Sequence, residues 1–352
     1  MRSASCWCGW PGAASAGPYA PPRHRRVRRR ERGGASLPPG QAQVKGDTVP
    51  TLRSFSELLQ AAACPPLATV AIAGADEVEV LEAAAECSRL ALARPILVGP
   101  EARIRRLASD HRLDLAGCQV LDCEGAAAAQ TTIDLIRSGQ AQVAVKGLVS
   151  TPTLLQAALD RQTGLRTGRL VSHVGVFEIP GFPRLLCISD GGVVLFPTLE
   201  QKIEIIRNAI GVARTLGIER PRVALLAGTN QVAADRPVTC EVASLAAMDT
   251  LWEAEGAWVD GPFTLDAAVD PAAAAAAGRG GEVAGKADVL VGPTLESTNT
   301  MCKGITYFAG GQMAGLVVGT AAPLSLGSRS DPAKTRLACI AIGVLMAKAG
   351  RL

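Results

Sequence analysis

The sequence predicts an α/β protein of two domains, with mostly parallel sheets covered by helices. Apolar runs of strand length alternate with longer runs of helical period from about Leu52 to the end of the chain. Such β-α-β order is typical of parallel sheets, whose crossover connections are helices. The 352 residues, 48% of them hydrophobic, are enough to bury two cores, and the aromatic fraction of only 3% makes those cores aliphatic.

The elements are expected in alternation along the chain. Strands are expected at residues 69–74, 95–99, 143–145, 223–227, 289–291 and 316–319, and helices at residues 77–93, 131–137, 200–216 and 334–347, with another through Ile104 and Leu107. The middle of the chain differs, because residues 171–177 and 185–188 flank Pro180-Gly181-Phe182-Pro183 and predict a hairpin-like pair.

Residues 1–51 are a different kind of sequence. In residues 1–50 nine basic side chains stand against two acidic ones, prolines are frequent, and no strand or helix period is present. We expect a disordered basic extension, translated from a start codon assigned too far upstream; a targeting presequence and a nucleic-acid-binding arm are the alternatives. The rest of the chain carries a net charge of about −3, so it offers no general basic surface for nucleic acid.

Composition and motifs argue against several classes of protein. No apolar run approaches the roughly 20 residues of a membrane span. The ten cysteines include no Cys-x-x-Cys and the three histidines lie far apart, so neither a zinc site nor a disulfide framework is expected. Neither a dinucleotide-binding nor a P-loop motif is present.

Asp266 and Asp270 would share a helix face and could hold a divalent metal, but a solvated face is the ordinary role of such a pair. The expectation is a soluble protein of the reducing cytoplasm, with no bound metal.

A first polar cluster follows the strand at 143–145. Lys146, Ser150 and Thr151 come directly after it, and Pro152 indicates the first turn of the next helix. Ligands of open α/β sheets bind at the carboxyl ends of strands. A helix N-terminus binds anions and also needs capping side chains, so Ser150 or Thr151 can be a cap and a ligand at once.

The cluster continues through Arg169 and Ser172. An arginine offers phosphate a planar fork of donors, although a solvated surface charge is its more common role. Ser172 and His173 begin a strand, so their side chains point to opposite faces, and one can face a cleft while the other packs. A general base is one role for His173, and a structural histidine is the alternative.

A second cluster, Gly327-Ser328-Arg329-Ser330-Asp331, precedes the last helix. Ser328 and Arg329 lie in a loop where a phosphate would meet both side chains and backbone amides, and Asp331 before Pro332 suits an N-cap. Hydroxyls, amides and arginines that follow strand ends indicate chemistry on a small phosphate-bearing anion rather than on a polymer.

Together these stretches resemble the phosphate acetyl/butyryltransferase family over about residues 52–350. The resemblance rests on Val145-Lys146-Gly147-Leu148-Val149-Ser150-Thr151, on Gly164-Leu165-Arg166-Thr167-Gly168 with Leu170-Val171-Ser172-His173-Val174, on Val259-Asp260-Gly261-Pro262 with Leu265-Asp266, and on Ser328-Arg329. The first two are closer to the butyryl branch than to the acetyl branch. Many members carry a tyrosine before the lysine that matches Lys303, and this chain has Cys302 there.

The resemblance implies a direct transfer, in a ternary complex, between short-chain acyl-CoA and phosphate, which gives acyl phosphate and CoA. It implies the two-domain fold of isocitrate and isopropylmalate dehydrogenases, with the site in the interdomain cleft, a homodimer or larger homo-oligomer, and no cofactor beyond the coenzyme A thioester that serves as substrate. We expect one α/β domain in residues 52–172 and 313–352 and the second in residues 173–312.

Site residues follow from the two clusters and the resemblance. The expected substrate-binding residues are Lys146, Ser150, Thr151, Arg169 and Ser172, and the expected catalytic residues are Ser328, Arg329 and Asp331. Arg329 would stabilise phosphate and oxyanion charge, Ser328 would donate a hydrogen bond, and Asp331 is the carboxylate near the place of the acetyl branch's base. The alternatives are a degenerate member that binds CoA or acyl phosphate, and a metal- and nicotinamide-dependent decarboxylating dehydrogenase of the same fold.

Overall fold

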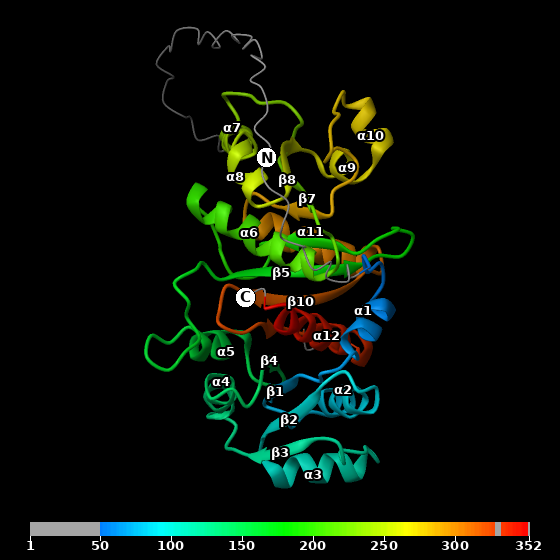
Figure 1. The fold of residues 1–352 in the computed structure, drawn as a ribbon, viewed down its shortest axis with the longest axis vertical. Coiled ribbons are helices and arrows are strands. Elements are labelled where there is room, and N and C mark those ends of the chain that lie inside the picture. Colours follow the sequence, from blue (N-terminus) through cyan, green and yellow to red (C-terminus); the bar gives the residue numbers. More distant parts are fainter. Residues whose placement is uncertain (1–49, 328–331, 351–352) are drawn as a thin grey trace, which may run out of the picture. The chain divides into compact units, whose positions relative to one another are not determined.

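The computed structural model describes residues 50–327 and 332–350, and within them the strands form one mixed sheet (Figure 1). The strands are β1 Thr69–Ala73, β2 Arg94–Gly99, β3 Gln119–Asp122, β4 Val143–Lys146, β5 Ser172–Glu178, β6 Leu186–Ser189, β7 Arg222–Leu226, β8 Trp258–Phe263, β9 Val289–Val291, β10 Gln312–Val318 and β11 Leu324–Ser325. Their order across the sheet is β3-β2-β1-β4-β11-β10-β5-β6-β9-β7-β8.

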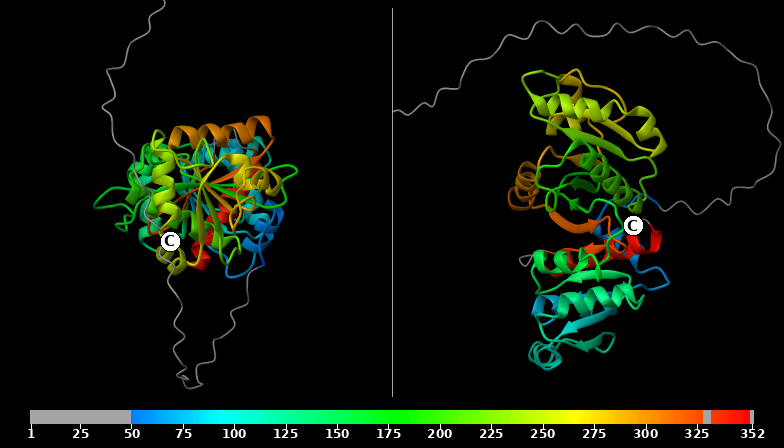
Figure 2. Two further views of the ribbon diagram at one scale, coloured as in Figure 1. Left: turned by 90° about the horizontal axis from the view of Figure 1, so that it is seen from above. Right: turned by 90° about the vertical axis from the view of Figure 1, so that its left-hand side faces the viewer.

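Helices cover the sheet on both faces (Figure 2). They are α1 Phe55–Ala62, α2 Val78–Arg89, α3 Glu101–Asp110, α4 Ala128–Arg137, α5 Thr151–Ala158, α6 Leu199–Thr215, α7 Pro237–Ala246, α8 Asp249–Ala254, α9 Leu265–Val269, α10 Pro271–Ala276, α11 Leu295–Phe308 and α12 Ala333–Ala349. The predicted α/β class, with a mostly parallel sheet flanked by helices, is confirmed. The division into two domains at residues 172 and 313 stays a prediction.

Two blocks of parallel strands make up most of the sheet, and they run in opposite directions. The first block is β3, β2, β1, β4 and β11, and the second is β6, β9, β7 and β8. Between them β10 is antiparallel to both β11 and β5, and β5 is antiparallel to β6. The hairpin-like pair predicted for residues 171–177 and 185–188 is therefore confirmed as β5 and β6.

The register brings the carboxyl ends of both blocks onto one row across the sheet. Val145 of β4 is level with Ser325, Ser325 with Leu316, Leu316 with Val174, and Val174 with Ser189 at the end of β6. Loops that follow β4, β11 and β6 therefore leave the sheet close together. This is where the direction of the strands switches, which is the ordinary place for a ligand in an open α/β sheet.

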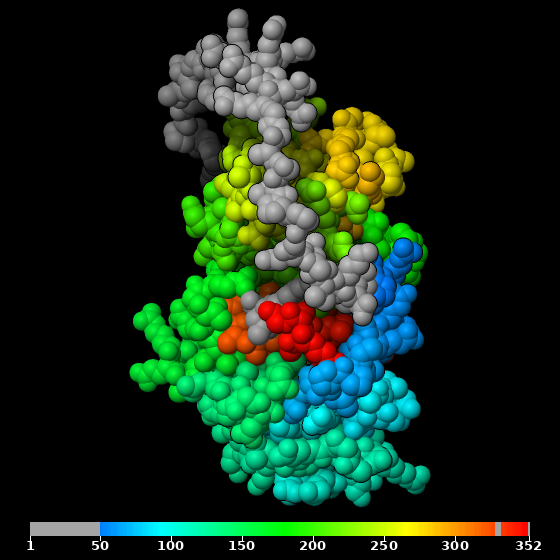
Figure 3. Space-filling model, viewed as in Figure 1, coloured from blue at the N-terminus to red at the C-terminus, as the bar shows by residue number. Residues whose placement is uncertain are grey.

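The last helix, α12, is buried on nearly every side. It packs on β10 and on α1, α2 and α6, and α1 and α12 lie side by side in the space-filling view (Figure 3). Its sequence has no polar face, as expected for a helix enclosed by other elements. Within residues 50–327 and 332–350, no helix combines the length and the apolar character needed to cross a membrane.

The expectation that Asp266 and Asp270 share a helix face is wrong. Asp266 lies in α9, but α9 ends at Val269, and Asp270 is extended and caps α10. Its carboxylate accepts the backbone N–H of Ala272 at 2.6 Å and that of Ala273 at 3.2 Å. Pro271, at the start of α10, disfavours a helical conformation at the residue before it, so Asp270 is extended and the two aspartates do not share a helix face.

Candidate active site

A cavity of about 480 Å³ opens where the strand ends meet, and its size is ordinary for a small-molecule site. It is bordered by the end of β4, the start of α5, the start of β5, the loop after β6, one side of α11, and the residues that follow β11. The lining residues are Lys146, Ser150, Thr151, Pro152, His173, Gly191, Gly192, Asn299, Cys302, Lys303, Thr306, Met313, Leu326 and Gly327.

The loop after β4 is held against the end of β1, and this places Lys146 at the cavity. Gly147 N–H donates to Ala73 O at 2.9 Å and Leu148 N–H to Gly74 O at 2.7 Å. A Cβ on Gly147 would lie 2.3 Å from Gly74 O, so only glycine allows this approach. The Lys146 side chain is buried, and its Nζ donates to Gly147 O at 3.1 Å.

Ser150 and Thr151 reach the cavity at the N-terminus of α5. Ser150 is the N-cap, and its Oγ accepts the backbone N–H of Thr153 at 3.2 Å. Pro152 lies in the first turn, as predicted, and supplies no N–H that would need a partner. Three of the predicted substrate-binding residues are thus brought together, with a lysine charge and a helix N-terminus that both favour an anion.

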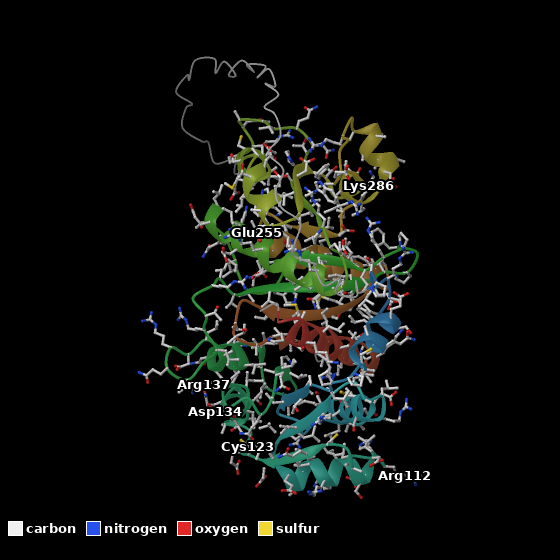
Figure 4. All side chains as sticks on the ribbon, viewed as in Figure 1. Arg112, Cys123, Asp134, Arg137, Glu255 and Lys286 are labelled. Atoms are coloured by element: carbon white, nitrogen blue, oxygen red, sulfur yellow. The ribbon has the colours of Figure 1, made fainter. Side chains whose placement is uncertain are left out.

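Arg169 and Ser172 are not brought to this cavity. The Ser172 hydroxyl is fully buried and accepts from Asn208 Nδ2 at 2.8 Å, on the α6 side of the sheet. Arg169 Nη2 donates to Asn208 Oδ1 at 2.9 Å and lines a second cavity of about 510 Å³. The second cavity contains Arg207, whose Nε donates to Glu255 at 2.9 Å (Glu255 is labelled in Figure 4).

Ser328, Arg329 and Asp331 lie outside the described residues. Leu326 and Gly327, which line the cavity, directly precede them in the chain, and α12 begins at Ala333 with Pro332 at its N-cap position. The roles expected for these three residues therefore stay predictions.

The loop after β6 is organised by a buried aspartate that sequence reasoning missed. Asp190 accepts backbone N–H groups from His173 at 3.2 Å, Gly192 at 2.7 Å, Val193 at 2.9 Å and Val194 at 3.1 Å. A carboxylate with four donors is well satisfied without any side-chain partner. The loop therefore keeps Gly191 and Gly192 at the cavity wall beside His173.

His173 lies on the cavity face of β5, opposite in direction to Ser172, as strand alternation predicts. Burial lowers the pKa of His173, the Lys303 charge lowers it further, and the Asp190 charge opposes both. The balance favours a neutral imidazole at pH 7.

Helix α11 forms the opposite wall, which sequence reasoning had not assigned. Asn299 Nδ2 donates to Gly191 O at 2.8 Å and ties the helix to the loop after β6. Cys302 is buried, which raises the pKa of its thiol to about 12, and Lys303 is exposed. One signal could have found this face. Cys302, Lys303 and Thr306 follow Asn299 by three, four and seven positions, which is the spacing of residues on one side of a helix.

The cavity is therefore lined by both polar and apolar groups. Lys146, Lys303 and the N-terminus of α5 suit a phosphate-bearing group, while Met313 and Leu326 with Cys302 offer an apolar surface to a short carbon chain. Fold and cavity together define an α/β protein with a cavity that suits a small anionic ligand, at the place where two blocks of strands meet.

The chain belongs to the family described as phosphate acetyl/butaryl transferase, whose model matches residues 54–135 and 126–344. It is 39% identical over 296 residues to a phosphate butyryltransferase of Clostridium beijerinckii, covering 84% of this chain and 98% of that protein. It is also 39% identical over 295 residues to a phosphate acetyltransferase of Rhizobium meliloti, covering 83% and 93%. The structure of a branched-chain phosphotransacylase from Enterococcus faecalis aligns with a TM-score of 0.71 at 28% identity, covering 80% of this chain and 99% of that one.

Proposed function

We propose that this protein transfers a short acyl group between coenzyme A and phosphate, giving acyl phosphate and free CoA from acyl-CoA. The observation that carries the proposal is the cavity, which is lined both by the polar residues Lys146, Ser150 and Thr151 and by the apolar side chains of Met313 and Leu326. Membership of the family and the names of its relatives support the same reaction. Equal identity to a butyryl and an acetyl enzyme leaves both acyl groups in the proposal.

The chemistry needs an anion held beside a thioester carbonyl. Phosphate oxygen attacks the carbonyl carbon, a tetrahedral oxyanion forms, and CoA leaves as a thiolate; no protein nucleophile is needed. In our proposal Lys146 and the N-terminus of α5 hold phosphate, with Ser150 and Thr151 as hydroxyl partners. Ser328 and Arg329 stabilise the developing charge, and Asp331 accepts the CoA thiol proton in the reverse direction. Coenzyme A is a substrate, and no other cofactor or metal is proposed.

Cellular setting and assembly are part of the same proposal. We propose that the protein works in the cytoplasm, because the spacing of its ten cysteines supports no disulfide framework, and that it forms a homodimer or larger homo-oligomer. The substrates are small molecules, and neither nucleic acid nor a membrane is a proposed partner.

The test is phosphate-dependent release of CoA from acetyl-, propionyl- and butyryl-CoA, with and without EDTA. Release that requires phosphate and is unaffected by EDTA supports the acyltransferase and ranks the chain lengths. Loss of CoA release in EDTA would show that the transfer requires a metal, which the proposal does not include. CoA binding without any release would favour the degenerate binding member.

Lys146→Met separates phosphate binding from the rest of the site. Loss of a charge-assisted hydrogen bond costs about 1.5–3 kcal/mol, so KM for phosphate is expected to rise about ten- to a hundredfold. The matched control is Lys286→Met, since Lys286 is exposed and is not among the residues that line the cavity (Figure 4). An unchanged KM for phosphate in Lys146→Met would remove Lys146 from the phosphate site.

A further inference from the structure

His173 lies at the cavity with neither ring nitrogen hydrogen-bonded to a described residue. The residue is 8% exposed, and its Nδ1 is buried without a partner. Only its backbone is paired: the N–H donates to Asp190 Oδ2 at 3.2 Å, and the carbonyl accepts from Ser189 Oγ at 2.8 Å. Buried polar groups are nearly always paired, so an unpaired imidazole beside a cavity indicates a partner that arrives with the ligand.

Two glycines give the imidazole its space and fix its position. A Cβ on Gly192 would lie 3.1 Å from His173 Cγ, so the loop after β6 packs tightly against one flank of the ring. A Cβ on Gly315 would lie 3.1 Å from His173 Nε2 and 2.6 Å from Leu326 O. Gly315 faces Gly175 across β10 and β5, so the sheet surface next to Nε2 carries no side chain.

The surroundings do not prepare His173 to act as a base. The Asp190 carboxylate accepts four backbone N–H groups and does not bond the imidazole, so within residues 50–327 and 332–350 the ring has no hydrogen-bonded carboxylate to orient it or to share a proton. Among the described residues, the other charged or titratable groups that line the cavity are Lys146, Lys303 and the thiol of Cys302. The Lys303 charge opposes a positive charge on the ring.

The position of the ring proton follows from the same surroundings. A neutral imidazole carries one N–H, and a proton on Nδ1 would be a buried donor without an acceptor, which is the rarer kind of unpaired group. We assign the proton to Nε2 on this hydrogen-bonding argument. The ring then presents a donor, rather than a lone pair, to a ligand beside Gly315.

We propose that His173 is a catalytic residue of the transfer proposed above, and that its neutral imidazole donates Nε2–H to the acyl carbonyl oxygen. A phosphate oxygen forms the new C–O bond, and the carbonyl π electrons move to oxygen. When the carbonyl re-forms, the C–S bond breaks and its electrons leave with sulfur as the CoA thiolate, which is protonated by the same group that accepts the thiol proton in the reverse direction. His173 keeps its own proton throughout and stabilises only the oxyanion. The inference rests on the proposed function.

The test compares a variant that keeps a donor with variants that lose it. The amide nitrogen of His173→Gln reaches about as far as Nε2, whereas His173→Phe fills the space with no donor. One oxyanion donor is worth about 10²–10³-fold in kcat, so His173→Phe should lose that factor while His173→Gln stays within about tenfold of the wild type. KM for acyl-CoA and for phosphate should change little, because the oxyanion exists only in the transition state.

Controls separate this role from the alternatives. His111→Phe replaces an exposed histidine outside the cavity and should keep wild-type kinetics. The pH profile of kcat/KM should keep its shape in His173→Gln, because no proton is transferred to the ring. If His173→Phe does not fold by circular dichroism, His173→Asn replaces it, since its amide reaches only to the Nδ1 position, and the same loss is expected.

Two results would overturn the proposal. A His173→Gln variant as slow as His173→Phe, or one that lost the acid limb of the pH profile, would make His173 a base. A folded His173→Phe with near wild-type kcat would remove His173 from catalysis. Both results are compared with the rate of the wild-type protein, which must release CoA in the presence of phosphate. If the wild-type protein releases none, the proposed function itself is overturned, and the role of His173 with it.

Discussion

Replacing Ser172 by alanine should lower the stability of the protein and leave its kinetics nearly unchanged. The Ser172 hydroxyl is 0% exposed and accepts from Asn208 Nδ2 at 2.8 Å, on the face of β5 opposite His173. Asn208, which is 3% exposed, gives its other amide proton to Leu170 O at 3.0 Å. Ser172→Ala therefore leaves one buried amide proton without an acceptor, which costs about 1–3 kcal/mol.

Asn208→Ala should cost more, because it removes three hydrogen bonds at once. It leaves the Ser172 hydroxyl and Leu170 O without the amide, and it removes the acceptor of Arg169 Nη2 at 2.9 Å. Arg169 is exposed, so water can replace that contact. The two remaining losses, at about 1–3 kcal/mol each, predict about 2–6 kcal/mol, and the two variants should couple in a double-mutant cycle by about 0.5–3 kcal/mol.

Equilibrium unfolding in urea measures these changes, and steady-state CoA release measures the kinetics of the same samples. Ser244→Ala is the matched control, since Ser244 is exposed on α7, and its change should stay within about 0.5 kcal/mol. A Ser172→Ala variant with an unchanged urea midpoint and a tenfold higher KM for phosphate would refute the reasoning. It would show that the hydroxyl serves substrate, as the sequence had led us to expect.

Three further predictions concern the cavity. Met313→Ala removes apolar side-chain volume from the cavity lining. It should raise kcat/KM for butyryl-CoA relative to acetyl-CoA by about fourfold for each methylene accommodated, measured by CoA release. Equal changes for both substrates would exclude Met313 as a chain-length determinant. Cys302 should react with iodoacetamide at pH 8 more slowly than the exposed Cys64, because burial raises the pKa of the Cys302 thiol to about 12. Mass spectrometry of a digest measures both rates, and equal rates for Cys302 and Cys64 would contradict this. Burial lowers the pKa of His173 below its ordinary value of 6.5. Near that pH the unfolded chain therefore binds a proton that the folded protein does not. The free energy of unfolding should fall as the pH drops below about 6.5, by up to about 1.4 kcal/mol per pH unit. Urea unfolding of the wild type and His173→Gln checks this, and identical pH dependence in the two proteins would refute it.

Local sequence was sufficient for elements that are buried on both sides. The strand expected at residues 289–291 matches β9, and the strand expected at 143–145 matches β4 to within one residue, because a buried parallel strand is a continuous apolar run. The start of α5 was also predictable, since Ser150 and Pro152 are local signals for a helix N-terminus.

Elements with weaker local signals were missed or misjudged. Strand β11 has only two residues, Leu324 and Ser325, and is a strand because it pairs with β4 and β10. The helix expected to continue to residue 93 ends at Arg89, because Ala91 adopts a positive φ of 52° and Leu92 turns into β2. Asp190 gave no signal at all, since its role comes from four backbone N–H groups that only the folded loop presents.

The sequence alone determined the α/β class, the alternation of strands and helices, and a polar cluster at the end of β4, because each depends on residues close together in the chain. Only the tertiary structure decided which polar residues share a cavity. Lys146 and Met313 are far apart in sequence, and they meet because β11 and β10 pair in a register that no local pattern specifies. The same pairing put Ser172 on Asn208 and His173 at the cavity: strand alternation separates two neighbours onto opposite faces, but the packing of α6 and α11 decides which face binds substrate.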